Sequence, residues 1–177
     1  LLAAGMMRPR ENSPGGYDWF RNRLMFPIRD LTGRVIGFGG RALADGEKAK
    51  YLNSPESVLF DKSSLVFDMS LARESIVASK QAVVVEGYMD VIIPHQAGVT
   101  NLVATLGTAL TEQHVRLLAR YAEEVVLMFD ADTAGVSAAQ RALELFIRQQ
   151  FNVRVASIPS GKDPCDMVLA QGPDALR

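Results

Sequence analysis

The chain has 177 residues, a net charge of −1 and a single cysteine. With 48% hydrophobic residues it can bury a sizeable core, but its apolar runs are far shorter than the roughly 20 residues that cross a bilayer. One cysteine excludes an internal disulfide and a cysteine-cluster zinc site. The N-terminus lacks a signal-peptide pattern, so we expect a soluble cytoplasmic protein. Because the chain does not begin with Met, we also expect a fragment of a longer protein.

Positive charge is concentrated near the N-terminus. Residues 1–50 contain nine Lys and Arg against five Asp and Glu, a balance of +4, whereas residues 51–177 contain ten against fifteen, a balance of −5. An enzyme that acts on polyphosphate or nucleic acid needs cations to offset its own carboxylates. A solvated basic surface would give the same count, so charge alone leaves both interpretations open.

The first part of the chain is predicted to be rich in β-structure. Residues 1–16, with two prolines and paired glycines, are typical of a linker or of the end of a preceding unit. Residues 23–29 and 34–39 predict a β-hairpin across the turn Asp30-Leu31-Thr32-Gly33, and residues 46–55 look irregular. We therefore expect a small, basic, β-rich subdomain at residues 17–60.

Residues 61–177 show an alternation of strands and helices. After a helix at 65–79, strands are predicted at 82–85, 101–104, 125–129 and 153–158, with helices at 89–96, 111–121, 134–149 and 166–171. Thr111 is the expected N-cap of its helix. Such alternation predicts an α/β fold, a parallel sheet with helices on both faces.

Acidic residues follow the predicted strands. Glu86 and Gly87 come directly after the first strand of the sheet, and Asp130 and Asp132 come after the third. Ligands of open α/β sheets bind at the carboxyl ends of the strands. We expect these acids to lie together at that edge.

Three further acids lie near the same edge. Asp90 can face back toward Glu86 if a helix begins at once, and Asp163 and Asp166 follow the last strand. Like charges at 4 Å repel by roughly 4 kcal/mol at an effective dielectric of 20, so a cluster needs neutralising cations. Oxygen ligands favour Mg²⁺ or Mn²⁺, and two ions would suit phosphoryl transfer. Helix N-capping is the competing interpretation, above all for Asp132.

Several segments together resemble a known family. The pair Glu86-Gly87 with Asp130-Ala131-Asp132 and Gly135 resembles the TOPRIM signature of primases, topoisomerases and some nucleases. Over nearly the whole chain from Tyr17, five motifs in order resemble the RNA polymerase core of bacterial replicative DNA primases of the DnaG type. These motifs occupy residues 20–30, 33–41, 50–56, 85–90 and 106–109.

The resemblance implies a TOPRIM-type, Rossmann-like parallel sheet after the basic subdomain. It implies a DNA-dependent RNA polymerase that makes short RNA primers on single-stranded DNA from ribonucleoside triphosphates, with Mg²⁺ or Mn²⁺, two or more ions. The catalytic acids would be Glu86, Asp130 and Asp132, and these would also hold metal. Asp90 and Asp163 would be further metal ligands. Residues that would contact nucleotide or template, or line a basic surface, are Arg21, Arg23, Arg41, Lys50, Tyr51 and Asn53.

The chain departs from the family at Asp163-Pro164-Cys165-Asp166, where many relatives place the second acid immediately after the proline. Asp166 is therefore expected only to cap the last helix. Primases of this type carry a zinc-binding module before this core and a helicase-binding module after it, which would contact the replicative helicase. The resemblance therefore implies that this chain is the excised catalytic core without those two modules.

Three alternatives stay open. A phosphatase with an aspartyl nucleophile would also place Asp130 and Asp132 after a strand, but only 45 residues follow Asp132. Another TOPRIM enzyme, a nuclease or topoisomerase fragment, shares the acids but matches the basic motifs less well. A non-enzymatic Mg²⁺-binding interaction domain would explain the acids but not the basic N-terminal segment.

Overall fold

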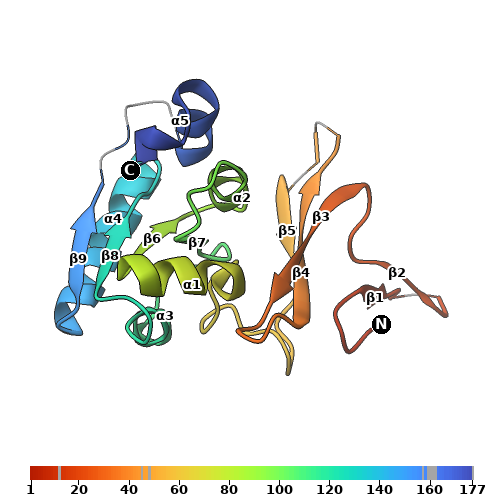
Figure 1. Cartoon of the computed structure of the whole chain (residues 1–177). Helices are drawn as coiled ribbons and strands as arrows, with labels where there is room; N and C mark the ends of the chain where they lie inside the picture. Colours follow the sequence, from red (N-terminus) through yellow and green to blue (C-terminus); the bar gives the residue numbers. More distant parts are fainter. Residues whose placement is uncertain (12, 45, 48, 157, 159–162, 177) are drawn as a thin grey trace. The chain divides into compact units, whose positions relative to one another are not determined.

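The structure, a computed structural model, describes residues 1–177 except 12, 45, 48, 157, 159–162 and 177. The chain divides into two compact units, Leu1–Asp61 and Lys62–Arg177 (Figure 1). None of the helices among the described residues combines the length and the apolar character that crossing a membrane requires.

The first unit consists of short antiparallel sheets. Strand β1 (Met7–Pro9) pairs with β2 (Gly16–Asp18), and a second sheet has the order β3-β4-β5, with β3 at Arg23–Arg29, β4 at Val35–Ala42 and β5 at Tyr51–Asn53. The predicted hairpin is confirmed by the pairing of β3 with β4. Its turn is held by Asp30, whose carboxylate accepts the backbone N–H groups of Thr32 and Arg34. The hydroxyl of Thr32 is the main cause of the lowered pKa of Asp30.

Three strands of this unit lie where the sequence predicted none. Strand β1 lies within residues 1–16, β2 begins at Gly16, and β5 lies within the segment expected to be irregular. Each is only three residues long and lacks an alternating apolar pattern, so its strand conformation comes from pairing with a neighbour. Trp19 contributes to this pairing, because its indole Nε1 donates to the carbonyl of Asn53 at 3.0 Å.

The second unit is built on a parallel sheet of order β7-β6-β8-β9. The strands are β6 (Gln81–Val85), β7 (Leu102–Ala104), β8 (Glu124–Leu127) and β9 (Asn152–Val155). The helices are α1 (Met69–Ser79), α2 (Met89–Gln96), α3 (Glu112–Leu118), α4 (Thr133–Arg148) and α5 (Pro164–Gln171), followed by a 3₁₀ turn, Pro173–Leu176. Helices cover both faces of the sheet (Figure 1), which confirms the predicted fold class.

Two details of the helices show where tertiary contacts act. Helix α1 begins at Met69 rather than at residue 65, because the buried Phe67 instead forms a bridge with Ala104 at the edge of the sheet. Thr111 caps α3 as predicted, since its hydroxyl accepts the N–H of His114 at 3.3 Å. The buried His114 ring accepts the N–H of Thr111 in return, which completes a capping box.

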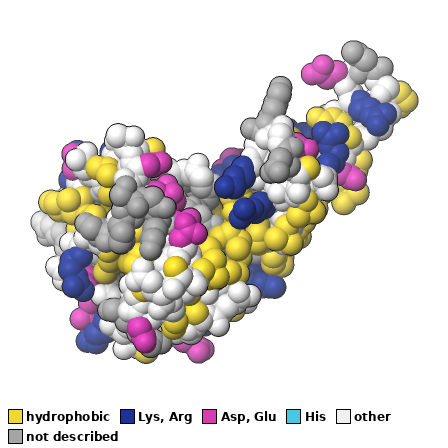
Figure 2. All heavy atoms as spheres, turned by 90° about the horizontal axis from the view of Figure 1, so that it is seen from above, with side chains coloured by type: hydrophobic (Ala, Val, Ile, Leu, Met, Phe, Trp, Pro, Cys, Tyr) yellow, Lys and Arg dark blue, Asp and Glu magenta, His cyan; other side chains and the backbone are white. Residues whose placement is uncertain are grey.

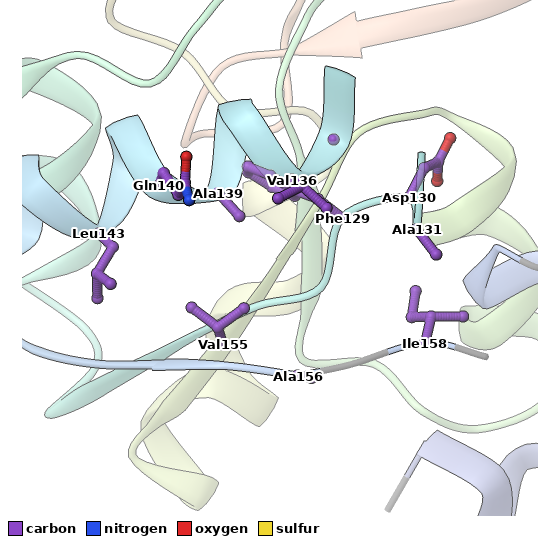
Figure 3. Close-up of a pocket in the computed structure, with 11 residues that line it drawn as sticks. Phe129, Asp130, Ala131, Val136, Ala139, Gln140, Leu143, Val155, Ala156 and Ile158 are labelled. Atoms are coloured by element: carbon purple, nitrogen blue, oxygen red, sulfur yellow. The ribbon is translucent and has the colours of Figure 1, made fainter. Parts of the chain in front are cut away.

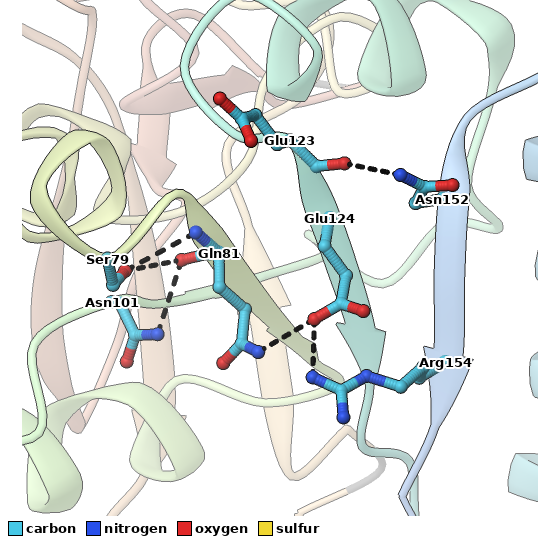
Figure 4. A network of polar contacts seen from close by, with 7 residues as sticks. All are labelled: Ser79, Gln81, Asn101, Glu123, Glu124, Asn152 and Arg154. Atoms are coloured by element: carbon cyan, nitrogen blue, oxygen red, sulfur yellow. Dashed lines mark hydrogen bonds and ion pairs between the residues drawn. The ribbon is translucent and has the colours of Figure 1, made fainter.

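Polar side chains tie the amino ends of the strands together (Figure 4). Glu124 on β8 accepts a hydrogen bond from Gln81 on β6 at 2.9 Å and pairs with Arg154 on β9. The backbone carbonyl of Gln81 in turn accepts the side-chain amide of Asn101. This edge of the sheet therefore has its charges paired within the fold, unlike the carboxyl edge.

Candidate active site

The carboxyl ends of β6 and β8 lie side by side at the centre of the sheet. The parallel register pairs Val84 with Leu127, so Glu86 and Asp130 follow adjacent strand ends. Glu86 Oε1 accepts the backbone N–H of Asp130 at 3.2 Å. The buried apolar strands below the two acids hold both chain segments in place.

Gly135 allows the first turn of α4 to approach these acids closely. A Cβ atom at this position would lie 2.2 Å from the carbonyl oxygen of Asp130 and 2.9 Å from Glu86 Oε1. Real Cβ atoms essentially never come this close to other heavy atoms. Glycine at position 135 is therefore a requirement of the site, because the helix passes directly against the backbone of one acid and the side chain of the other.

Two of the predicted metal ligands cap helices. Asp132 is the N-cap of α4, and its Oδ1 accepts the N–H of Gly135 at 2.7 Å. Asp163 is the N-cap of α5, and its Oδ1 accepts the N–H of Asp166 at 2.7 Å. The expectation that Asp166 caps this helix is wrong, because Pro164 takes the first helical position and leaves the cap to the residue before it.

Asp90 is the most buried of the acids, with 7% of its surface exposed. Its Oδ2 accepts the N–H of Gly87 at 3.0 Å, and the backbone of Cys165 also donates to it. Burial raises the pKa of Asp90 to about 7, and the charges of Asp163 and Asp130 add to the rise. Asp90 thus connects the start of α2 with the start of α5.

The remaining acids also influence one another. Burial raises the pKa of Glu86, and the charges of Asp130 and Asp132 raise it further, although the N–H of Asp130 opposes the shift. Burial likewise raises the pKa of Asp130, with added repulsion from Asp163, Asp132 and Asp166. Each of the six acids that the sequence placed at this edge thus interacts electrostatically with at least one of the others.

Among the residues that the structure describes, none of the ion pairs includes one of the six acids. Within the same part of the chain, no three Asp, Glu, His or Cys side chains converge closely enough to enclose a metal ion. A set of like-charged oxygen donors without a counter-charge fits hard divalent cations.

An apolar cavity of about 300 Å³ lies beside Asp130 (Figure 3). It is formed mainly by Val136, Ala139 and Leu143 of α4 and by Val155 of β9. The carboxylate of Asp130 points away from these apolar side chains in Figure 3. The cavity therefore adds no further acid to the site.

The predicted nucleotide-binding residues lie in the first unit, where two of the arginines each lie close to the ring of a tyrosine. Arg41 Nη1 donates to the hydroxyl of Tyr51 at 3.1 Å, and its guanidinium lies 5.7 Å from the centre of that ring. The exposed Arg21 lies 5.3 Å from the ring of Tyr17. Lys50 is exposed, and Lys and Arg side chains appear in dark blue on the surface in Figure 2.

Arg23 and Asn53 have structural roles in this unit. Only 6% of the Arg23 side chain is exposed, and its Nη1 donates to the carbonyls of Gly40 and Lys50. Asn53 receives the Trp19 hydrogen bond through its backbone. The structure thus separates Arg23, which ties β3 to β4 and to the segment before β5, from the exposed Arg21 and Lys50.

Comparisons with known proteins agree with this arrangement. The profile of the family described as "DNA primase catalytic core, N-terminal domain" matches residues 1–73, and the "Toprim-like" profile matches residues 83–168. A DNA primase of Synechococcus elongatus is 54% identical over 166 residues, which are 90% of this chain and 24% of that protein.

Solved structures agree over almost the whole chain. A DNA primase domain from Pseudomonas aeruginosa is 45% identical with a TM-score of 0.93, covering 99% of this chain and 56% of that one. A DnaG primase catalytic domain bound to single-stranded DNA is 40% identical with a TM-score of 0.89, covering 99% and 55%. The present chain spans about a quarter of the curated relative named above. It belongs to the family of bacterial DnaG-type DNA primases, as a segment of their RNA polymerase core with its TOPRIM domain.

Proposed function

We propose that this chain is the catalytic part of a DNA primase, a nucleotidyltransferase that makes short RNA primers on single-stranded DNA. The observation that carries the proposal is the position of Glu86, Asp130 and Asp132 at the carboxyl edge of the sheet, where none of the ion pairs among the described residues includes them. The single-stranded DNA bound to the related DnaG domain supports DNA as the template.

Two or more Mg²⁺ or Mn²⁺ ions would supply the activation of a 3′-hydroxyl and the neutralisation of a triphosphate. Glu86, Asp130 and Asp132 would hold them, with Asp90 and Asp163 as further ligands. The contribution of the chain itself is positional. The N–H of Asp130 holds the Glu86 carboxylate, and the N–H of Gly135 holds the Asp132 carboxylate. Each side chain is therefore kept in one orientation before the substrate binds.

Nucleotide and template would be held by the first unit. Arg21, Arg41 and Lys50 would contact phosphates, because an arginine fork matches phosphate oxygens in pairs. Tyr51 would offer its ring to a base, and the Arg41 hydrogen bond fixes the direction of its hydroxyl. Arg23 and Asn53 would act indirectly, by positioning the strands that carry these residues. Contact with the replicative helicase stays a prediction for residues outside this chain.

The alternatives are less well supported. The acids alone would also suit another TOPRIM enzyme or a Mg²⁺-binding interaction domain. The match of residues 1–73 to the N-terminal domain of a DNA primase catalytic core favours primer synthesis over both, because neither alternative accounts for that match.

The test is incorporation of labelled ribonucleotides on single-stranded DNA with Mg²⁺ or Mn²⁺. We expect Glu86→Gln and Asp130→Asn to reduce incorporation by at least about a hundredfold with an unchanged circular dichroism melt, and Glu144→Gln, on the exposed face of α4, to have no effect. Incorporation that persists in both site variants would refute the assignment of the acids.

A further inference from the structure

A second cavity, of about 340 Å³, reaches Glu86 from the loop that follows β7. Its walls are Glu86, Phe129, Thr105 with residues 107–110, and one face of α4. The α4 face carries Ala134, Ala138 and Ala142, whose small side chains leave the space open. The segment 105–110 contains the family-like motif at residues 106–109, to which neither the sequence nor the acid site assigned a task.

Arg141 brings a positive charge to this cavity. It lies on the same face of α4 as the three alanines and lines the cavity together with Glu86. Among the described residues no carboxylate forms an ion pair with Arg141, whereas Arg148 on the same helix pairs with Glu144 at 3.6 Å. The charge of Arg141 is therefore available to a ligand, and a ligand placed between Arg141 and Glu86 can meet both groups.

Thr108 adds a polar group that lacks a partner. Its Oγ1 is buried without a hydrogen-bond partner among the described residues, and Thr108 lines the cavity. A buried hydroxyl left in this state costs about 1–3 kcal/mol. A rotation of the Thr108 side chain toward the cavity would let a hydroxyl or phosphate oxygen of a bound molecule supply the missing partner.

Size and charge limit the class of ligand. Ligand cavities measure roughly 300–1,000 Å³, so this one suits a single nucleotide rather than a longer piece. Its one free cation balances the single charge of a phosphodiester, whereas a nucleoside triphosphate carries several charges and needs more cations than the described lining provides.

We propose that this cavity binds the 3′-terminal nucleotide of the growing strand. Arg141 holds the terminal phosphodiester, Thr108 contacts the sugar or phosphate oxygens, and the 3′-hydroxyl is presented at Glu86. The inference rests on the proposed function and deepens it, because it assigns the strand end and the incoming triphosphate to different residues of the chain.

The test measures strand binding and triphosphate use separately. The variants are Arg141→Gln and Thr108→Val, with Arg148→Gln as the matched control on the same helix. In extension of an RNA oligonucleotide annealed to single-stranded DNA, Arg141→Gln should raise the KM for the oligonucleotide about tenfold, as expected for one charge-assisted contact. The KM for the triphosphate should change less than about twofold, Thr108→Val should act in the same direction more weakly, and Arg148→Gln should match the unaltered protein.

Binding of a fluorescent oligonucleotide duplex, measured by anisotropy, provides a readout that does not need turnover. Replacing the terminal phosphodiester by an uncharged methylphosphonate should weaken binding to the unaltered protein and have no further effect on Arg141→Gln. Equal losses in both proteins, or an unchanged oligonucleotide affinity in Arg141→Gln, would overturn the inference. Absence of extension by the unaltered protein, with this binding pattern intact, would instead count against the proposed function alone.

Discussion

Glu86 Oε1 and the backbone nitrogen of Asp130 are joined by a hydrogen bond of 3.2 Å across the ends of β6 and β8. The bond fixes one acid by the backbone of the other. The bond does not involve the Asp130 carboxylate, and none of the ion pairs among the described residues includes that carboxylate, so the strand ends form a site with excess negative charge.

Divalent ions should stabilise the folded chain. Because the clustered acids repel one another, Mn²⁺ or Mg²⁺ should raise the melting temperature, by the equivalent of about 2.7 kcal/mol at a hundred times the Kd. Asp130→Asn should remove most of this gain, whereas Glu144→Gln should keep it. Thermal melts with and without a chelator measure the effect, and an equal gain in both variants would place the ions elsewhere.

Asp90 should make stability depend on pH. Burial raises its pKa from the ordinary value of 3.8 to about 7 in the folded chain, so the folded state keeps its proton to a higher pH than the unfolded state. Metal-free protein should therefore lose stability relative to Asp90→Asn as pH rises from about 4 to about 7, and the difference should be constant above that. The full difference in pKa corresponds to a loss of at most about 4 kcal/mol in the free energy of unfolding.

Urea unfolding at a series of pH values checks this, with the exposed Glu74→Gln as a control for loss of charge. A stability difference between Asp90→Asn and the unaltered protein that stays constant from pH 4 to pH 8 would contradict the prediction.

Substitutions of Asp132 can separate capping from metal binding. Asp132→Ala removes the acceptor of the Gly135 N–H and should cost about 1 kcal/mol of stability. Asp132→Asn keeps an acceptor and should cost much less. If Asp132 also binds metal, both variants should lose ribonucleotide incorporation to a similar extent. Full activity in Asp132→Asn would leave this residue only its capping role.

Gly135→Ala should disturb the site through the backbone. The added Cβ would overlap the carbonyl oxygen of Asp130, so helix α4 or the Asp130 segment must move. We expect the free energy of unfolding, measured in urea, to fall by about 1–3 kcal/mol or more, and ribonucleotide incorporation to be lost. Ser137→Ala, on the exposed side of the same helix, should change the free energy of unfolding by less than about 0.5 kcal/mol. A stable and active Gly135→Ala protein would show that the close approach is not needed.

Two arginines of the first unit should behave differently. Arg23→Ala removes hydrogen bonds to the carbonyls of Gly40 and Lys50 from a side chain that is only 6% exposed, so it should lower the melting temperature. Arg21→Ala, at an exposed position, should leave stability nearly unchanged. It should instead weaken binding to single-stranded DNA and reduce the salt dependence of log K by about 0.7 per lost phosphate contact. Fluorescence anisotropy at several salt concentrations measures this slope. If Arg21→Ala lowered the melting temperature and Arg23→Ala only weakened DNA binding, the two assignments would be wrong.

Much of the second unit follows from local patterns in the sequence. Apolar runs such as Val83-Val84-Val85 alternate with amphipathic segments, and this pattern alone predicts the parallel sheet and the helix bounded by Thr111. The edge at which Glu86 and Asp130 meet was also predictable, because parallel strands place their carboxyl ends together. In contrast, β1, β2 and β5 are too short to carry a pattern, and only pairing with other strands defines them.

By itself the sequence determined the fold class, the family resemblance and the set of acids, because these depend on residue type and on spacing along the chain. Only the tertiary structure decided what each acid contacts. It made Asp163 rather than Asp166 the cap of α5, placed Arg23 inside its unit, and brought Arg141 and Thr108 to a cavity beside Glu86. Hydrogen-bond partners and burial arise from segments that are distant in sequence, so residue spacing alone does not contain them.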